Sequence, residues 1–550
     1  MAKERNTSSE HPPLDGAAAA LRQQATGKTG VRALWSNMKV FYIALFASFG
    51  GLMYGYQQGV LGQALVMHSF EKGWLTSILQ LGGWFGALSA EFTCEIFSRK
   101  YTLFAGSVWT ILGSYLTAGA ANSSYLYAGR FFTGLGKPLY NAELAPPEIR
   151  GLLIALQQFA KTIGIMTAYW IAYDTNYIGG TGEGQSEMAW RLPLIIQGIP
   201  GIILAIGVWF LPFSPRLLVN KGKDEEARDA LCFLRSLPRD DPLVEVELLE
   251  IKAEHLFEEQ AFAKRFPSMA ENARSSPWTR EAMQYASIFK KKDSFKRVAI
   301  AGLVMFFQQW SSIDSIIYYA PIIFQSLGLD GNTISLLATG VVGVVNVVTT
   351  IPAILLIDRV GRKPLLLAGS IGMFLCQVIT GIIVAKCQHD WKANVAAGWA
   401  AVVMIWLYIA NFAYSWGPAS WILIAEIFPL SIRAKGTAIG ASSNWMNNFI
   451  VAFITPPMLE GITWGMYIFF AGWLALGTVF VWFFVPETKG KTLEEMDHAF
   501  GSNTSLEDMG ILRNIQDEIG LTRALGVNGF DAHSLETKKV GANETEHLEV

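Results

Sequence analysis

The sequence predicts an all-α membrane protein whose twelve transmembrane helices form two halves of six. Two observations carry this prediction. Apolar and aromatic residues make up 51% of the 550 residues and charged residues only 16%, whereas soluble domains carry about 25% charge. The charges also gather in a few segments, so that long apolar stretches remain between them. A bundle of membrane-spanning helices accounts for such stretches.

The spans follow from length, because a helix that crosses about 30 Å of hydrocarbon needs roughly 20 mainly apolar residues. Six stretches precede a polar segment and six follow it: 39–62, 74–95, 101–121, 124–143, 151–173, 190–212, 298–322, 333–357, 365–386, 396–425, 434–457 and 464–486. We therefore divide the chain into an N-terminal tail (1–38), a first half (39–212), a central loop with short helices (213–297), a second half (298–486) and a C-terminal tail (487–550). The tail beyond residue 500 is polar and is expected to be disordered.

The distribution of basic residues predicts the orientation. With the N-terminus inside, the loops that face the cytoplasm carry most of the Lys and Arg residues, whereas loop 174–189 holds acids and no Lys or Arg. Lys386 and Lys392, in an outer loop, are exceptions. The positive-inside rule therefore places both tails and the central loop in the cytoplasm.

Composition also excludes several classes of function. A net charge of -2 without a basic stripe argues against a nucleic-acid partner. The four cysteines lie in no metal-like spacing. We find no nucleophile–base pair, so no enzyme activity, catalytic residue, metal or cofactor is predicted. The expected partners are a small-molecule substrate and the lipid bilayer, and the oligomeric state is left open.

The two halves repeat one feature at the same place. Each has a short basic loop between its second and third helices, Ser98-Arg99-Lys100 in the first half and Asp358 to Lys363 in the second. Paired six-helix halves are typical of transporters whose substrate site lies near the midplane between the halves.

Several strings carry a resemblance to a known family. They are Gly55-Tyr56, Gly129-Arg130, Pro147-Glu148-Ile149-Arg150-Gly151, Gln308-Gln309-Trp310, Tyr318-Tyr319-Ala320-Pro321, Asp358 to Lys363, Trp416-Gly417-Pro418, Glu426-Ile427-Phe428-Pro429, Arg433 and Pro486-Glu487-Thr488-Lys489-Gly490. Because all these strings occur in the family's order, the chain resembles the sugar porter family of the major facilitator superfamily, particularly its fungal hexose-transporter-like members. The resemblance runs from about residue 38 to 500. The resemblance implies the major facilitator fold and a plasma-membrane carrier of monosaccharides that works by alternating access.

The resemblance also implies a substrate site. The matching residues are Gln158, Gln308, Gln309, Asp314, Asn346, Trp421 and Asn444. Neutral amides donate and accept hydrogen bonds, as sugar hydroxyls require, and an aromatic ring can face the apolar side of the sugar. For any one amide alone, hydrogen bonding between helices is an equal explanation. Asp314 stands where many relatives have Asn, so its charge is expected to alter substrate preference.

A second implied set forms a cytoplasmic charge network that latches the halves in the outward-facing state. Its members are Arg99, Glu143, Arg150, Asp358, Arg362, Glu426 and Arg433. Basic residues there also serve membrane topology, and the two roles are compatible.

The first half departs from the family pattern. Proton-coupled members carry an acid after Gly-Tyr that pairs with the arginine corresponding to Arg130, but this chain has Gln57, which cannot release a proton. We therefore expect facilitative transport that is not proton-coupled in the usual way. The fourth span also lacks roughly seven residues, about 10 Å of helix, which places Lys137 in the middle of the span. Either this helix slides in the bilayer or the bilayer thins around it, and a wrong splice boundary is another explanation of the gap.

Two further departures concern charge. Phe213 replaces a glutamate, and Lys161 lies in the fifth span near Gln158. Lys161 could reach for the membrane surface, line the transport path, or pair with an acid such as Asp314. Three functions stay open: a hexose carrier, a sugar sensor without transport, and a carrier of another small polar metabolite. Asp314 and Lys161 would suit a charged ligand in the third case.

Overall fold

The computed structural model describes most of the chain, and all its regular elements are helices. The described residues are 38–64, 72–96, 98–139, 150–180, 185–235, 237–265, 277–290, 292–328, 332–489, 496, 500 and 504–525. They divide into two compact units, which we take separately. The larger one comprises residues 41–214 and 271–506, and the smaller one residues 215–270 and 507–550 with the first 40.

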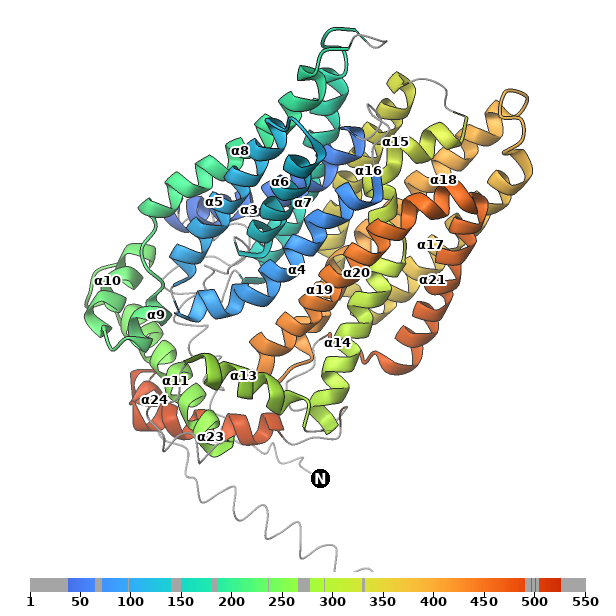
Figure 1. Cartoon of the computed structure of the whole chain (residues 1–550). Helices are drawn as coiled ribbons and strands as arrows, with labels where there is room; N and C mark the ends of the chain where they lie inside the picture. Colours follow the sequence, from blue (N-terminus) through green and yellow to red (C-terminus); the bar gives the residue numbers. More distant parts are fainter. Residues whose placement is uncertain are drawn as a thin grey trace, which may run out of the picture. The chain divides into compact units, whose positions relative to one another are not determined.

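The first half of the larger unit has six long helices in the predicted order (Figure 1). They are α3 (Met38–Ala64), α4 (Lys72–Ile96), α5 (Arg99–Ala118), α6 (Ser123–Leu139), α7 (Arg150–Thr175) and α8 (Met188–Gly207), the last continued by the 3-10 turn η2 (Val208–Phe210). α6 packs against both α4 and α5, and α5 also packs against α8. Lys137 lies in the last turn of α6.

In the second half, the prediction is wrong for two spans, because each of them consists of two helices and not of one. The span 298–322 is divided into α14 (Lys292–Trp310) and α15 (Ile313–Ser326), and the span 396–425 into α18 (Val395–Tyr414) and α19 (Trp416–Glu426). The other helices are α16 (Asn332–Val360), α17 (Arg362–Cys387), α20 (Arg433–Gly461) and α21 (Trp464–Phe484), with α13 (Pro277–Ile288) before α14 and the short turn η3 (Leu430–Ile432) before α20.

Side chains of each broken span donate hydrogen bonds to carbonyl groups at the break in the other span. Ser312 has a positive φ of 83°, which ends α14 and frees backbone groups. Tyr408 Oη donates to Ser311 O at 2.6 Å, and Gln308 Nε2 donates to Trp416 O at 2.7 Å. Non-helical backbone at membrane depth persists only where its polar groups are satisfied inside the protein. The breaks therefore mark a protein-lined polar region.

A row of glycines brings α3 against α7. Gly51, Gly55 and Gly59 recur every four residues, so they share one face of α3. A Cβ atom at Gly55 would lie 1.8 Å from Lys161 O, a distance that no side chain permits. Small residues at this spacing allow close helix contact in membranes. The row thereby fixes Tyr54 of α3 opposite Lys161 of α7.

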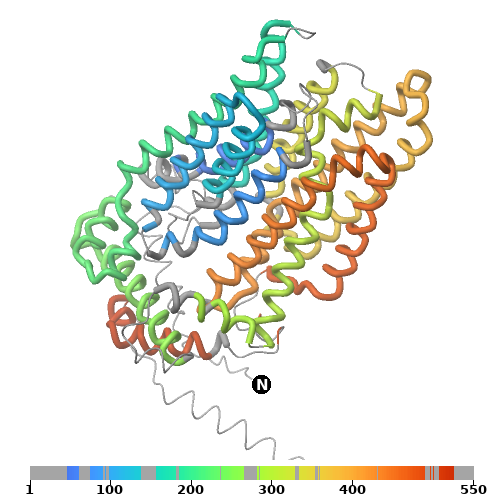
Figure 2. Tube along the Cα trace, viewed as in Figure 1, coloured from blue at the N-terminus to red at the C-terminus, as the bar shows by residue number. Residues whose placement is uncertain are grey.

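The two halves meet along two helix pairs, α4 with α20 and α7 with α16. Figure 2 shows the first half in blue to green and the second in yellow to red, with α4 beside α20. Trp84 Nε1 donates to Ser442 Oγ at 2.9 Å across this contact. Five described segments are apolar and long enough to cross a membrane on their own, and all lie in α8 or the second half.

The smaller unit contains α9 (Pro215–Asn220), α10 (Asp224–Arg235), α11 (Pro242–Arg265), most of α23 (Thr504–Glu518) and α24 (Leu521–Ala524). Ile515 of α23 packs against Phe257 and Ala261 of α11. The expected disorder beyond residue 500 is therefore wrong for 504–525. An apolar face with a docking partner is enough to order these polar helices.

Candidate substrate site

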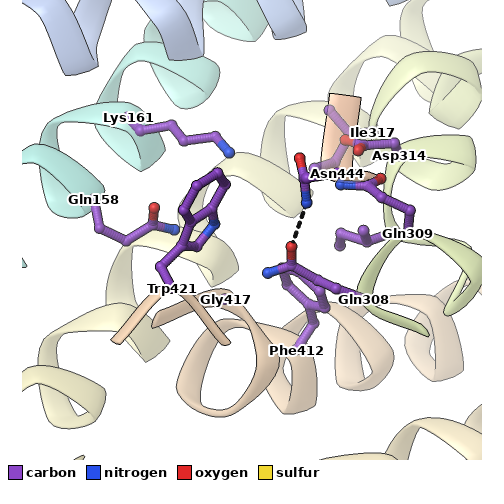
Figure 3. A pocket seen from close by; sticks show the side chains of 11 residues that line it. Gln158, Lys161, Gln308, Gln309, Asp314, Ile317, Phe412, Gly417, Trp421 and Asn444 are labelled. Atoms are coloured by element: carbon purple, nitrogen blue, oxygen red, sulfur yellow. Dashed lines mark hydrogen bonds between the residues drawn. The ribbon is translucent and has the colours of Figure 1, made fainter. Parts of the chain in front are cut away.

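A polar pocket lies inside the larger unit, where about 340 Å³ of space, part of it open to solvent, is not filled by atoms. Both halves line it, and Figure 3 shows Gln158 and Lys161 entering from α7 while amides enter from the other side. The lining residues are Gln158, Lys161, Gln308, Gln309, Ile313, Asp314, Ile317, Phe412, Gly417, Trp421 and Asn444. We refer to it as the polar pocket.

The second half holds its amides in fixed orientations. Gln308 donates from Nε2 to Trp416 O at the α18–α19 break, so its Oε1 remains an acceptor. Asn444 Nδ2 of α20 donates to that Oε1 at 2.6 Å (Figure 3). Both amides are buried. Because each holds the other, the pocket presents a preorganised set of donors and acceptors.

The first half contributes charge. Of the three positions open to Lys161, the structure shows it on the pocket wall, with Nζ 4.3 Å from the centre of the Tyr54 ring. Lys137 Nζ lies 4.7 Å from the same ring and 5.7 Å from the Trp445 ring. Aromatic faces attract cations and partly offset their desolvation. Tyr54 is therefore shared by two ammonium groups.

Arg130 of α6 completes what we call the cation cluster, Arg130, Lys137 and Lys161. Arg130 and Lys137 are at most 1% exposed. Within the described part of the chain, Lys137 Nζ and two guanidinium nitrogens of Arg130 have no hydrogen-bond partner. A buried cation without a paired acid is costly inside a membrane, so this arrangement is typical of a functional site.

Asp314 joins the two halves through what we call the Asp314 bridge: Gln58, Asp314, Tyr318 and Asn448. Gln58 Nε2 of α3 donates to Asp314 Oδ1 at 3.3 Å and to Tyr318 Oη at 3.1 Å. Asn448 Nδ2 of α20 donates to Asp314 Oδ2. Tyr318 Oη donates to Asn448 Oδ1 at 3.2 Å. Both carboxylate oxygens thus accept an amide hydrogen, one from each half.

The predicted substrate residues are mostly brought together. Gln158, Gln308, Gln309, Asp314, Trp421 and Asn444 line the polar pocket, whereas Asn346 of α16 does not. Sequence reasoning missed Ile317 and Phe412 of the pocket, and also Gln58 and Asn448 of the bridge. Gln58 and Asn448 are amides in otherwise apolar spans, the same signal that singled out Gln308.

The gating residues are described in part. Arg362 Nη2 and Glu426 Oε1 form an ion pair at 2.8 Å, and Arg433 donates from Nε to Phe428 O at 3.4 Å. Gln57 is buried in α3. Glu143 and the side chains of Arg99, Arg150 and Asp358 lie outside the described residues.

Beside this ion pair, Glu487 caps the start of α17. Its carboxylate accepts the backbone N–H groups of Arg362 and Lys363, each at 3.0 Å, and of Thr488 and Lys489, each at 2.9 Å. Burial raises the pKa of Glu487, but these four donors lower it, and the net pKa lies below its usual value. We call this arrangement the Glu487 clamp.

The basic loop of the first half is held differently. Lys100 Nζ donates to Leu211 O at 2.7 Å and lies 4.9 Å from the centre of the Phe213 ring. In the second half, Lys363 Nζ likewise donates to a carbonyl, Trp482 O, at 2.7 Å. The lysines match, but Phe213 offers a ring where the second half offers a carboxylate.

Comparison with known proteins adds the family. A family model described as "Sugar (and other) transporter" matches residues 43–500. The chain is 34% identical over 505 residues to a probable quinate permease of Aspergillus fumigatus, covering 85% of this chain and 88% of that one. It is 32% identical over 502 residues to a quinate permease of Neurospora terricola, covering 84% and 89%. Among solved structures, the partially occluded inward open xylose transporter XylE from E. coli is similar, with a TM-score of 0.65, 25% identity, and coverage of 83% and 100%.

Proposed function

Because the chain belongs to the sugar (and other) transporter family and is a multi-pass membrane transporter, we propose that it carries a small polyhydroxylated carboxylate by alternating access. The membership confirms the predicted resemblance, and the likeness to the xylose transporter confirms the predicted fold. The plasma membrane is its expected location. The substrate is the part that we propose.

Lys161 carries this proposal. It is the cation on the wall of a pocket whose other polar groups are mostly amides. An ammonium group forms charge-assisted hydrogen bonds with a carboxylate, and these are roughly twice as strong as neutral ones. The amides of Gln158, Gln308 and Asn444 suit ring hydroxyls. Quinate, named for the relatives, combines ring hydroxyls with one carboxylate.

An ionised Asp314 would repel a carboxylate substrate if no neighbouring group offset its negative charge. Both of its oxygens, however, accept amide hydrogens in the Asp314 bridge. Lys161 and Lys137 also both act electrostatically on its carboxylate. The cations outnumber the acid here, which supports an anionic rather than a neutral substrate.

Alternating access is supported by the two broken helices. α15 and α19 each contribute to the pocket and each begin at a break. Short helices that meet a continuous partner at a substrate site can tilt without unfolding the whole span. The Asp314 bridge, which joins α3 to α15 and α20, supplies a contact that such a motion must open.

Counterflow uptake tests the substrate. Purified protein is reconstituted into liposomes preloaded with unlabelled quinate or glucose, and uptake of the same labelled solute is measured. We expect quinate uptake, and a Lys161→Met variant that weakens quinate binding about 10- to 150-fold, since a hydrogen bond to a charged group contributes about 1.5–3 kcal/mol. The control is Lys392→Met, an exposed lysine of an outer loop, which should leave uptake unchanged.

Three outcomes decide between the alternatives. Uptake of glucose but not quinate would contradict the proposed carboxylate substrate and favour the hexose carrier that the resemblance implies. Uptake of neither, by a protein that remains folded, would favour the sensor. Quinate uptake that is equal in wild type and Lys161→Met would contradict the role of the ammonium group.

A further inference from the structure

We propose that Asp314 is the carboxylate that couples proton movement to transport, in place of the acid that is missing at Gln57. The inference rests on the proposed carboxylate substrate. The expectation of facilitative transport follows from position 57 alone. The structure places another carboxylate in the polar pocket, 3% exposed and bonded to both halves.

The first step is the geometry of the bridge. A carboxylate accepts hydrogen bonds on both oxygens, whereas a carboxylic acid must donate from one of them. Gln58 donates to Oδ1 and Asn448 to Oδ2. A proton on either oxygen takes one of its lone pairs and makes that oxygen a poorer acceptor for the amide bonded to it. Protonation weakens the bridge between α3 and α20, so the open bridge binds the proton more strongly than the closed one.

The second step is the set of charges around Asp314. Lys161 of α7 and Lys137 of α6 act on its carboxylate. Four tyrosines also face it, namely Tyr54 of α3, Tyr169 of α7, Tyr318 of its own helix and Tyr408 of α18. No described ion pair of 4 Å or less joins Asp314 to either lysine. In this described set of groups, Asp314 is the carboxylate, and Lys161 and Lys137 supply the positive charges that act on it.

The third step is competition for Lys161. When a substrate carboxylate binds the Lys161 ammonium group, it neutralises the positive charge that otherwise stabilises ionised Asp314. Two carboxylates in one buried pocket disfavour the state in which both are ionised. Asp314 then takes a proton from the water on the open side: its O–H bond forms as the substrate binds, and it breaks when the substrate leaves on the other side. One proton thus accompanies one anion, and no net charge crosses the membrane.

The test counts protons per substrate. Liposomes that contain the protein and a trapped pH-sensitive dye are mixed with labelled quinate under an inward proton gradient. Wild type should acidify the lumen by about one proton per quinate. In Asp314→Asn this ratio should fall to near zero, whatever the uptake rate, while Asp314→Glu should keep it near one. The control is Asp390→Asn, an exposed acid of an outer loop, which should match wild type.

A binding measurement covers the case in which Asp314→Asn carries nothing. Calorimetry of quinate binding in two buffers of different ionisation enthalpy counts the protons taken up on binding. Wild type should take up about one proton near neutral pH, and Asp314→Asn none. A ratio near one in Asp314→Asn, or quinate transport by wild type without acidification, would overturn the coupling role. Failure of wild type to move quinate at all would instead overturn the proposed function.

Discussion

Two groups of cations, one in each half of the transporter, are held in opposite ways. In the second half, Arg362 pairs with Glu426 and the Glu487 clamp holds the start of α17. In the first half, Lys137 and Lys161 lie on the face of Tyr54, and Lys100 lies against Phe213. Charges that are paired with acids fix structure, whereas buried charges without such pairing remain available to a ligand. The comparison supports the proposal that the second half positions the substrate while the first half selects its charge.

The largest effect is expected from Gln308→Leu in the second half. The change removes the acceptor of Asn444 Nδ2 and one of the two donors to Trp416 O, which keeps its bond from Ser420 Oγ at 2.8 Å. A buried group left unsatisfied costs about 1–3 kcal/mol. Quinate uptake should fall by up to about 150-fold, as measured by initial rates in liposomes. Gln377→Leu is the control, because Gln377 is also a buried glutamine, in α17, whose Nε2 has no partner among the described groups. Similar losses in both variants would show that position 308 has no special role.

Lys137→Met tests the first half. Replacing a buried cation that lacks a hydrogen-bond partner with an apolar side chain should stabilise the protein by about 1–4 kcal/mol. The same change should weaken quinate affinity several-fold, because a cation near the site is lost. Thermal unfolding and equilibrium binding measure the two effects. A fall in both stability and affinity would mean that Lys137 has a structural role, and the contrast between the halves would fail.

Glu487→Gln should destabilise the second half by about 1–2 kcal/mol, because a charged acceptor of four backbone N–H groups becomes a neutral one. The pH dependence follows from the lowered pKa of Glu487. Its stabilising contribution is fully present above the unfolded value of about 4.3 and is lost as pH falls through the folded pKa. The stabilities of wild type and variant in detergent should therefore converge as the pH falls through the lowered pKa of Glu487. A constant difference at all pH values would contradict this account.

The smallest effect is expected from Phe213→Glu, which gives the first half the acid that the second half has. An exposed ion pair with Lys100 is worth at most about 1 kcal/mol, and the variant also loses the ring that faces Lys100. We expect a change of melting temperature of only a few degrees, with quinate affinity unchanged. A large change in affinity would mean that this loop, and not only the cation cluster, selects the substrate.

The sequence predicted the order of the spans because apolar length is a strong signal. It did not predict the breaks at Ser312 and Ser415, since apolar residues continue on both sides of each break. The helices beyond residue 500 were missed because their order depends on docking to α11. Composition gives no indication of such a partner.

The substrate site was predicted through the resemblance, which named the pocket amides but also Asn346. Sequence spacing alone does not fix which way a helix is rotated, and Asn346 does not line the pocket. The Asp314 bridge could not be predicted, because Gln58 and Asn448 lie far from Asp314 along the chain. Only their identity as amides in apolar helices marked them.

The glycine row of α3 has a mechanical consequence. Gly51 and Gly55 place the backbone of α3 in direct contact with that of α7, and no side chain lies between them to cushion sliding. Because the two backbones pack this closely, we expect the two helices to move together. Tyr54 and Lys161 would then keep their spacing throughout the cycle, so the proposed site for the substrate's charge would move unchanged with the first half. Release of the proposed anion would then depend on hydration and on breaking its hydrogen bonds to the second half. The affinity of Lys161 for the anion would set a lower limit on the time that each anion stays bound.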